Sequence, residues 1–256
     1  MAAVPHLIDT HAHICDSAFD KDRREVLERA ESAGIVAVIA VGEDISDAEK
    51  NLALSRQYPI LYPAAGLYPT ILDLLAADAM ADFIRRNHAS LWAIGEVGLD
   101  FWIVKEETER ARQREIFALF IRLARELDLP LNVHSRSAGR HAVQVLLDHG
   151  AERVQMHAFD GKISAARPAL EAGFYFSVPP SVVRSRQKQK LVRHLPLGQI
   201  LVETDSPVLG ADPAERNEPA HLMTAVQAIA EIKEISKGAV LEAVTTNARE
   251  LYGIRV

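Results

Sequence analysis

The sequence predicts a (β/α)8 TIM barrel, in which eight parallel strands are each followed by a helix. Short apolar runs of strand length alternate with amphipathic helical patterns along the whole chain. Eight such runs in 256 residues are typical of this barrel. A doubly wound sheet shows the same alternation, but the length and the number of strands favour the barrel. Because no linker or low-complexity segment marks a boundary, residues 1–256 are predicted to form a single domain.

The expected strands are the apolar runs at residues 7–10, 35–41, 61–65, 91–95, 131–133, 154–156, 174–178 and 200–203. The clearest helical pattern covers residues 109–127, where Ile116, Phe120 and Leu123 lie on one apolar stripe. Ser46 followed by Glu49 has the form of a capping box that opens the next helix after the second strand. Residues 219–233 and 238–251 predict two further helices that close the outside of the barrel after the last strand.

Composition and charge narrow the class of protein. Apolar residues make up 48% and charged residues 25%, as in ordinary globular proteins, and no apolar run approaches the ~18 residues that span a membrane. The net charge of −6 argues against a protein that coats nucleic acid, although it allows a local grip on phosphate. The lack of a signal-peptide pattern and the single cysteine, Cys15, favour a cytoplasmic protein. Neither a membrane nor an obligate protein partner is predicted.

Two histidines end the first expected strand. Because side chains at positions i and i+2 of a strand point the same way, His11 and His13 are expected to project together. Two imidazoles on this spacing can converge on one metal ion at about 2.0–2.1 Å. Alone, the pair is a weak sign of a metal site, because such spacing also arises by chance.

Metal-binding side chains also stand where four other expected strands end. The active site of such a barrel lies at the carboxyl ends of its strands. A core histidine with one hydrogen bond would explain any one of these positions, but not four imidazoles and two carboxylates on one rim. The sequence therefore predicts a metal centre with six donor residues, which are His11, His13, Glu96, His134, His157 and Asp205.

The donors suffice for two divalent metal ions. The paired histidines of the first strand, with Asp205 and one oxygen of Glu96, would hold the first ion. The other two histidines and the second Glu96 oxygen would hold the second ion. Two cations about 3.5–4 Å apart activate a water between them, and mixed imidazole and carboxylate ligands favour Zn, Mn or Mg over calcium. Glu96 and Asp205 are the expected catalytic residues, the first bridging the ions and the second taking the water's proton.

The motifs around these residues resemble those of the TatD family of metal-dependent deoxyribonucleases, within the amidohydrolase-like barrels. They occur in family order over nearly the whole chain, at residues 9–13, 95–101, 133–136, 157–161 and 203–207. Further stretches, at 132–140, 177–181, 187–191 and 216–219, resemble most the subgroup of TatD-domain-containing protein 3. The resemblance implies a divalent-metal-dependent hydrolase of phosphodiester bonds, a deoxyribonuclease of the 3'-5' exonuclease kind, with DNA or another phosphodiester as its substrate.

Two residues are predicted to bind the substrate. Arg136 follows His134 by two positions, so it is expected to turn towards the pocket, where a planar guanidinium binds phosphate well. Tyr68 stands where many family members carry a histidine, in a Gly-x-His-Pro turn that the resemblance places near the scissile phosphate. A tyrosine there donates a hydrogen bond but carries no charge near neutrality, since its ordinary pKa is about 10.

Three other features stay open at the level of sequence. Asp100 either orients a metal ligand or caps a loop, and Trp102 either stacks on a base or covers the mouth of the barrel. A basic run follows the seventh strand and either steers nucleic acid or is a solvated helix face; it consists of Arg184, Arg186, Lys188 and Lys190.

Two other functions fit the same donors. The first is hydrolysis of an ester, lactone or amide in a small molecule, as in other amidohydrolases. An uncharged substrate of that kind would not need Arg136 or the basic run. The second is a metal-binding scaffold without catalysis, which the tyrosine at position 68 and the negative net charge favour. A complete set of donors argues against the scaffold.

Overall fold

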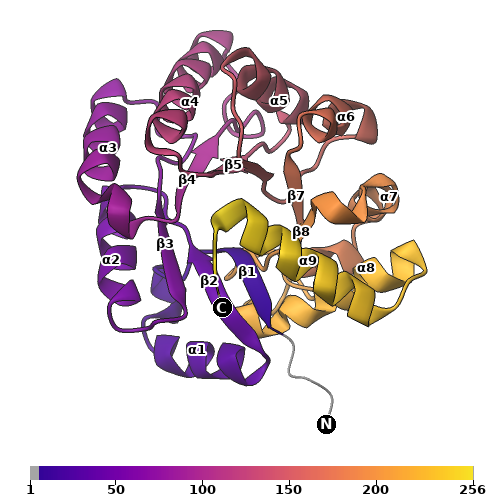
Figure 1. Cartoon of the computed structure of the whole chain (residues 1–256). Helices are drawn as coiled ribbons and strands as arrows, with labels where there is room; N and C mark the ends of the chain where they lie inside the picture. The colour runs from indigo at the N-terminus through magenta and orange to yellow at the C-terminus, as the bar shows by residue number, and fades with distance from the viewer. Residues whose placement is uncertain (1–5, 256) are drawn as a thin grey trace.

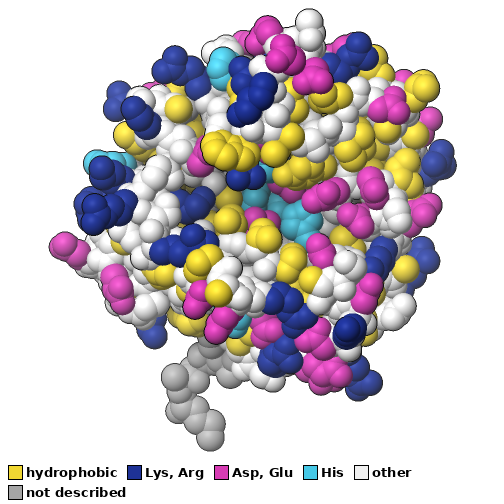
Figure 2. Space-filling view, turned by 180° about the vertical axis from the view of Figure 1, so that it is seen from behind, with side chains coloured by type: hydrophobic (Ala, Val, Ile, Leu, Met, Phe, Trp, Pro, Cys, Tyr) yellow, Lys and Arg dark blue, Asp and Glu magenta, His cyan; other side chains and the backbone are white. Residues whose placement is uncertain are grey.

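The computed structural model describes residues 6–255 as a barrel of parallel strands surrounded by helices (Figure 1). The strands are hydrogen-bonded in chain order from β1 to β8, and every pair is parallel. The predicted (β/α)8 fold is therefore confirmed. Helix α9 (Lys237–Tyr252) crosses one end of the barrel in Figure 1. Figure 2, seen from behind, shows histidine side chains at the floor of a hollow near the middle of the opposite face.

The strands match the apolar runs closely, but several bounds differ. They are β1 Leu7–Ala12, β2 Ile35–Ala40, β3 Leu61–Ala65, β4 Ala93–Gly98, β5 Leu131–His134, β6 Val154–Met156, β7 Tyr175–Val178 and β8 Ile200–Val202. Because β1 and β4 continue past their apolar runs, His11 and Glu96 lie within strands instead of after them. Their backbones are thus held by the sheet itself.

The barrel closes through residues at the ends of β1 and β8. The backbone N–H of Asp205 donates to the carbonyl of His11 at 2.8 Å, and that of His13 donates to Ser206 at 2.8 Å. The Asp9 carboxylate adds hydrogen bonds from the Thr204 backbone and hydroxyl. This seam therefore fixes the segment after β8, which carries Asp205, directly against β1.

Helices follow the strands around the barrel. They are α1 Arg23–Ser32, α2 Ile45–Ser55, α3 Leu74–Asn87, α4 Glu107–Leu127, α5 Gly139–Asp148, α6 Ile163–Glu171, α7 Arg186–His194, α8 Leu222–Lys233 and α9. The capping box expected at Ser46 is wrong, because the N-cap lies two residues earlier, at Asp44, whose side chain accepts from the Asp47 N–H at 3.0 Å. The predicted helix at residues 219–233 divides into a 3-10 turn, Pro219–His221, and α8. None of the helices within residues 6–255 combines the length and apolarity needed to span a membrane.

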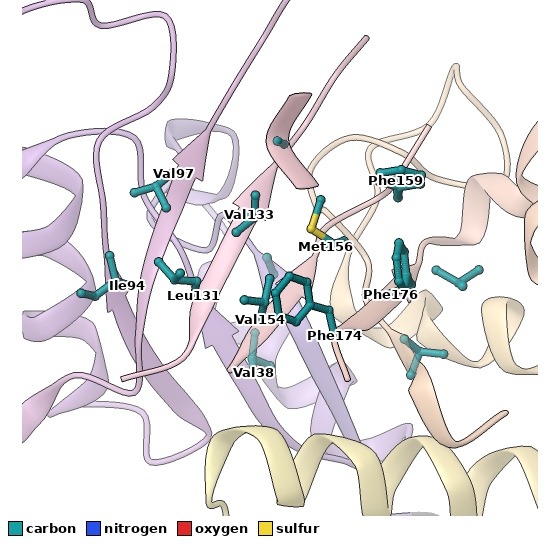
Figure 3. Close-up of a cluster of buried hydrophobic side chains, with 14 of the residues drawn as sticks. Val38, Ile94, Val97, Leu131, Val133, Val154, Met156, Phe159, Phe174 and Phe176 are labelled. Atoms are coloured by element: carbon teal, nitrogen blue, oxygen red, sulfur yellow. The ribbon is translucent and has the colours of Figure 1, made fainter. Parts of the chain in front are cut away.

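Two apolar cores hold this arrangement together. The larger core lies between the strands and the helices, and Figure 3 shows part of it around Val133, Met156 and Phe176. The smaller core lies at the end of the barrel that α9 crosses; its strand residues include Ile8, Ile39 and Leu201, and α9 contributes Leu251 and Tyr252. Apolar packing therefore fills the closed end of the barrel, and the polar residues of the site lie above it.

Candidate metal centre

The structure brings the six predicted donor residues together. Five of them are buried, and the side chain of His13 is only 13% exposed. They come from β1, β4 and β5 and from the segments that follow β1, β6 and β8, as expected for the carboxyl ends of barrel strands. Figure 2 shows histidine side chains at the bottom of the hollow on this face.

The first group of donors joins β1 to the segment after β8. His11 Nε2 lies 3.3 Å from both His13 Nε2 and the Asp205 Oδ1 atom. One atom from each of these three residues lies within 4.8 Å of the others, close enough to share one ion. These are three of the four donors that the sequence assigns to the first metal, the fourth being one oxygen of Glu96.

Glu96 lies between the two halves of the cluster. Its Oε2 atom is 3.3 Å from His13 Nε2, whereas its Oε1 atom is 2.6 Å from His134 Nδ1 and 3.9 Å from His157 Nε2. The two oxygens therefore face different imidazoles, which is the arrangement that a bridging carboxylate requires. A second three-residue group of possible ligands joins Glu96 and His157 to His11. Neither of the two groups includes His134.

Each imidazole except His13 has one nitrogen held by a residue outside the donor set. His11 Nδ1 pairs with Asn132 Oδ1 at 2.8 Å, and His157 Nδ1 pairs with Glu203 Oε2 at 2.9 Å. Because these oxygens accept, each Nδ1 donates its hydrogen and Nε2 becomes the nitrogen available to a cation.

His134 is turned the other way. Its Nε2 atom pairs with Asp100 Oδ2 at 3.1 Å, so Nδ1 faces Glu96 and the cluster. Asp100 thus holds an imidazole, one of the two roles that the sequence leaves open for it. Its other oxygen also caps the loop, because it accepts from the backbone N–H groups of Trp102 and Ile103.

Sequence reasoning missed Asn132 and Glu203 as supporting residues. Asn132 precedes His134 by two positions on β5, and Glu203 precedes Asp205 by two. The spacing that predicts the pair on β1 would also have directed attention to these residues, since polar residues buried inside a barrel need partners. Both are fully buried.

A buried tyrosine connects the two supporting residues. The Tyr252 hydroxyl, from the end of α9, accepts from Asn132 Nδ2 at 3.1 Å and donates to Gln155 Oε1 at 2.6 Å. Gln155 Nε2 donates in turn to Glu203 Oε2 at 3.1 Å. A continuous chain of hydrogen bonds therefore runs from His11 through the barrel interior to His157.

The electrostatics of the cluster favour a cation. Burial opposes a charge on His11, but the hydrogen bond to Asp205 and the charge of Glu96 outweigh it and raise the pKa to about 10. The pKa of His134 rises to about 9 against the same burial, because Glu96 and Asp100 are close. The negative charge of the carboxylates favours a proton on each of these imidazoles. A divalent cation would compete with that proton for the nitrogen lone pair. The donors present thus fit a divalent metal.

A pocket of about 420 Å³ opens beside the cluster. It is lined by Asp205 and His157 and also by Tyr68, Ser135, Arg136 and Lys188. Lys188 Nζ is anchored to the Ala158 carbonyl at 2.7 Å. Within residues 6–255, the buried Ser135 hydroxyl has no hydrogen-bond partner, and none is found for the side chains of Tyr68 and Arg136. The pocket therefore presents several hydrogen-bond donors with free capacity next to the candidate metal ligands.

The basic run after β7 does not act as one unit. Lys188 points into the pocket, whereas Arg184 donates to the Gly210 carbonyl at 3.3 Å. Arg186 and Lys190 do not line the pocket. Of the four residues, only Lys188 lines the pocket, and the choice between steering nucleic acid and a solvated face stays open for the other three.

An eight-stranded barrel with imidazoles and carboxylates at the carboxyl ends of its strands is the architecture of the metal-dependent, amidohydrolase-like hydrolases. Within that class, residues 8–253 match the family described as TatD related DNase, and the chain belongs to this family. This result confirms the resemblance carried by the sequence motifs and, with it, the expected class of hydrolase.

Similar proteins agree with this assignment. The chain is 43% identical to "Deoxyribonuclease TATDN3" of Homo sapiens, over 98% of this chain and 96% of that one. It is 32% identical to "Uncharacterized metal-dependent hydrolase YabD" of Bacillus subtilis (strain 168), over 97% and 99% of the two chains. Among solved structures, the TatD homolog YJJV of Escherichia coli k12 superimposes with a TM-score of 0.90 at 26% identity, covering 98% of this chain and 100% of the other.

Proposed function

We propose that residues 1–256 form a single-domain, divalent-metal-dependent phosphodiester hydrolase whose substrate is DNA, cleaved in the 3'-5' exonuclease manner. The observation that carries this proposal is the pocket beside the cluster, where Arg136, Lys188 and the unpaired Ser135 hydroxyl face the same space as Asp205. Cations and hydroxyl donors suit the oxygens of a phosphodiester. The similarity to human TATDN3, which is named a deoxyribonuclease, supports DNA as the substrate.

The cofactor of this proposal is a pair of divalent ions, Zn, Mn or Mg. Their ligands would be the first group of donors with one oxygen of Glu96, and then His134 and His157 with the other oxygen. Both carboxylates of the cluster are ionised, because the surrounding imidazoles lower the pKa of Glu96 and of Asp205 in spite of burial. When bound, divalent ions lower the pKa of a bound water molecule and neutralise negative charge on the phosphodiester.

The chain's own residues divide the remaining tasks. Asp205 belongs to both the cluster and the pocket wall, with Oδ1 3.3 Å from His11 Nε2 and Oδ2 3.7 Å from His157 Nε2. Its position suits it to take the proton of the attacking water as general base. Arg136 and Tyr68 would bind the non-bridging oxygens of the phosphate. Burial raises the pKa of Tyr68, so its hydroxyl stays protonated and donates.

The two alternative functions are less favoured by this pocket. A neutral ester, lactone or amide has no negative charge for the cations Arg136 and Lys188 to bind, whereas a phosphodiester has one. A metal-binding scaffold without catalysis would not need unpaired hydrogen-bond donors, such as the Ser135 hydroxyl, beside the cluster. A cytoplasmic location, with no obligate protein partner and no membrane contact, completes the proposal.

The decisive experiment compares cleavage of labelled single- and double-stranded DNA with Mg, Mn and Zn, before and after chelation. Wild-type protein should cleave DNA only with metal, and Asp205→Asn should lower the rate by roughly 10²- to 10⁴-fold, as for loss of a general base. Asp82→Asn, an exposed acid on α3, is the matched control and should leave the rate unchanged. Full metal-dependent activity in Asp205→Asn would overturn the role of Asp205. Hydrolysis of esters or lactones without any cleavage of DNA would favour the small-molecule alternative.

A further inference from the structure

Asp205 lies in a turn outside the sheet, unlike the donors that β1 and β4 carry within their strands. The last strand, β8, ends at Val202, and Asp205 has a φ of +53°, a left-handed conformation that residues other than glycine seldom adopt. Such a conformation persists only where the surrounding contacts enforce it. The position of the carboxylate therefore depends on what holds this turn, residues 204–208, which we call the Asp205 turn.

One buried side chain bridges the Asp205 turn. Asn217, which is 1% exposed, donates through Nδ2 to the carbonyl of Thr204 at 2.7 Å and to that of Val208 at 2.8 Å. The amide oxygen pairs with His221 Nδ1 at 3.1 Å, and since this oxygen only accepts, the imidazole donates. Both amide hydrogens are thus committed to the backbone carbonyls at the two ends of the turn.

The two neighbours of Asn217 in the chain are tied to α1 and to the residue before it. The Arg216 guanidinium donates to both oxygens of Asp22, at 2.6 and 2.8 Å. Glu218 accepts from Arg29 through both of its oxygens, also at 2.6 and 2.8 Å. Paired hydrogen bonds of this kind fix geometry as well as adding energy. The position of the bridging amide therefore does not depend on the exposed stretch of loop before it.

We propose that Asn217 is a positioning residue for the reaction, because its amide holds the Asp205 turn with the carboxylate facing both the metal cluster and the pocket. Asn217 is not one of the six donors and does not line the pocket, so it acts only through Asp205. The inference rests on the proposed function, in which Asp205 is a metal donor and the general base. Without the bridge the turn relaxes, and a displacement of about 1 Å at a reacting group lowers a rate by roughly 100-fold.

A second buried asparagine is a matched control at the other end of the same strand. Asn247, from α9, is 5% exposed and donates through Nδ2 to the carbonyls of Leu197 and Ile200 at 2.9 and 2.8 Å. It makes the same two kinds of hydrogen bond, but where β8 begins. Asn217→Ala and Asn247→Ala remove the same groups, so both should lower the melting temperature of the metal-free protein by several degrees.

Metal affinity separates a positioning role from a merely structural one. In calorimetric titrations with Zn and Mn, Asn217→Ala should bind about 10-fold more weakly than the wild type, as for loss of a residue that orients a metal ligand, and Asn247→Ala should bind like the wild type. At saturating metal and DNA, kcat should fall by roughly 10- to 100-fold in Asn217→Ala and stay at the wild-type value in Asn247→Ala. If an alanine variant does not fold, Asn217→Ser and Asn247→Ser, which keep one donor, are compared in the same way. Losses of metal affinity and kcat that are equal in the two variants, or absent from both, would overturn the proposal.

The outcomes separate this inference from the proposed function. If no DNA is cleaved with any metal, but metal binding weakens in Asn217→Ala and not in Asn247→Ala, the proposed function fails and the positioning of Asp205 stands. If the wild type cleaves DNA, but the two variants lose metal affinity and rate alike, the proposed function stands and the role of Asn217 fails.

Discussion

Replacing Tyr252 with phenylalanine removes one hydroxyl from the interior of the barrel and leaves the ring in place. That hydroxyl accepts from Asn132 and donates to Gln155, and the side chain is 3% exposed. Phenylalanine leaves Gln155 Oε1 without a hydrogen-bond partner, while Asn132 Nδ2 keeps only its bond to the Thr10 carbonyl. Because no water reaches so buried a position freely, the loss acts first on stability and then on the imidazoles that the amides support.

The magnitude follows from the groups left unpaired. One buried donor or acceptor without a partner costs about 1–3 kcal/mol. In a protein of this size each kcal/mol lowers the melting temperature by roughly 2–4 °C. Loss of a direct outer partner of a metal ligand lowers metal affinity by roughly 10- to 100-fold. Tyr252 acts one residue further out, through Asn132 on His11 and through Gln155 and Glu203 on His157, so we expect a smaller loss of affinity, of about 10-fold or less.

The assay combines urea unfolding in EDTA with calorimetric titration of Zn and Mn. Tyr62→Phe is the matched control, because Tyr62 lies beside the same apolar core and its hydroxyl has no hydrogen bond within residues 6–255. Tyr252→Phe should lose both stability and metal affinity, and Tyr62→Phe should lose neither. A Tyr252→Phe protein that unfolds like the control and binds metal like the wild type would refute the claim that this chain of hydrogen bonds supports the metal centre.

Two further predictions concern stability away from the donors' chemistry. Gly98 has a φ of +145°, and a Cβ atom there would collide with the carbonyl oxygen of His134. Gly173 also has a positive φ, of +83°, but has open space around it, so Gly173→Ala should cost only ~1 kcal/mol. Gly98→Ala should therefore destabilise the fold by more than Gly173→Ala. Urea unfolding of both variants compares them, and equal losses would contradict the collision. The Arg29 guanidinium donates to the Glu218 carboxylate at 2.6 and 2.8 Å and holds the pKa of Glu218 below its usual value. The pair therefore stabilises the fold above the unfolded-state pKa of about 4.3. This stabilisation disappears as the pH falls through the lower folded-state pKa of Glu218. Because Arg29 is half-exposed, Arg29→Met should lower the free energy of unfolding by only roughly 0.5–1 kcal/mol at pH 7. Near pH 2 the variant and the wild type should unfold with the same free energy. A difference in stability that grows as the pH falls would contradict this expectation.

The strand order and the positions of the donors follow from the sequence because both depend on local pattern. Apolar runs give the strands, and chain order gives the barrel its topology. Once the barrel is assumed, every strand end must meet at one rim, so Glu96 and Asp205 are brought near His11 by topology alone. The exact end of a strand, in contrast, does not follow from the local residue pattern. Backbone pairing with neighbours, not side-chain apolarity, carries β1 past residue 10 and places His11 within the sheet.

Which nitrogen of an imidazole faces the cluster could not be predicted from the sequence. That choice depends on residues from other strands, as with Asn132 for His11 and Asp100 for His134. Tyr252 is the extreme case, because it lies at the other end of the chain and enters the barrel from the face opposite the pocket. The rule that side chains at positions i and i+2 of a strand point the same way identifies residues on one strand. It gives no information about a helix that covers the end of the barrel opposite the pocket.

The tyrosine at position 68 illustrates how tertiary structure alters a conclusion drawn from one motif. Judged alone, Tyr68 removes a chargeable group that the family resemblance places near the scissile phosphate. In the structure, however, the tyrosine shares its pocket with Lys188, which comes from α7 and is anchored to the carbonyl of Ala158. Burial lowers the pKa of Lys188 while Glu203 and other nearby acids oppose the shift, so the lysine sits in the field of the carboxylates that surround the cluster. A basic side chain is thus present on another wall of the same pocket, and the exchange of histidine for tyrosine is not by itself evidence that catalysis has been lost.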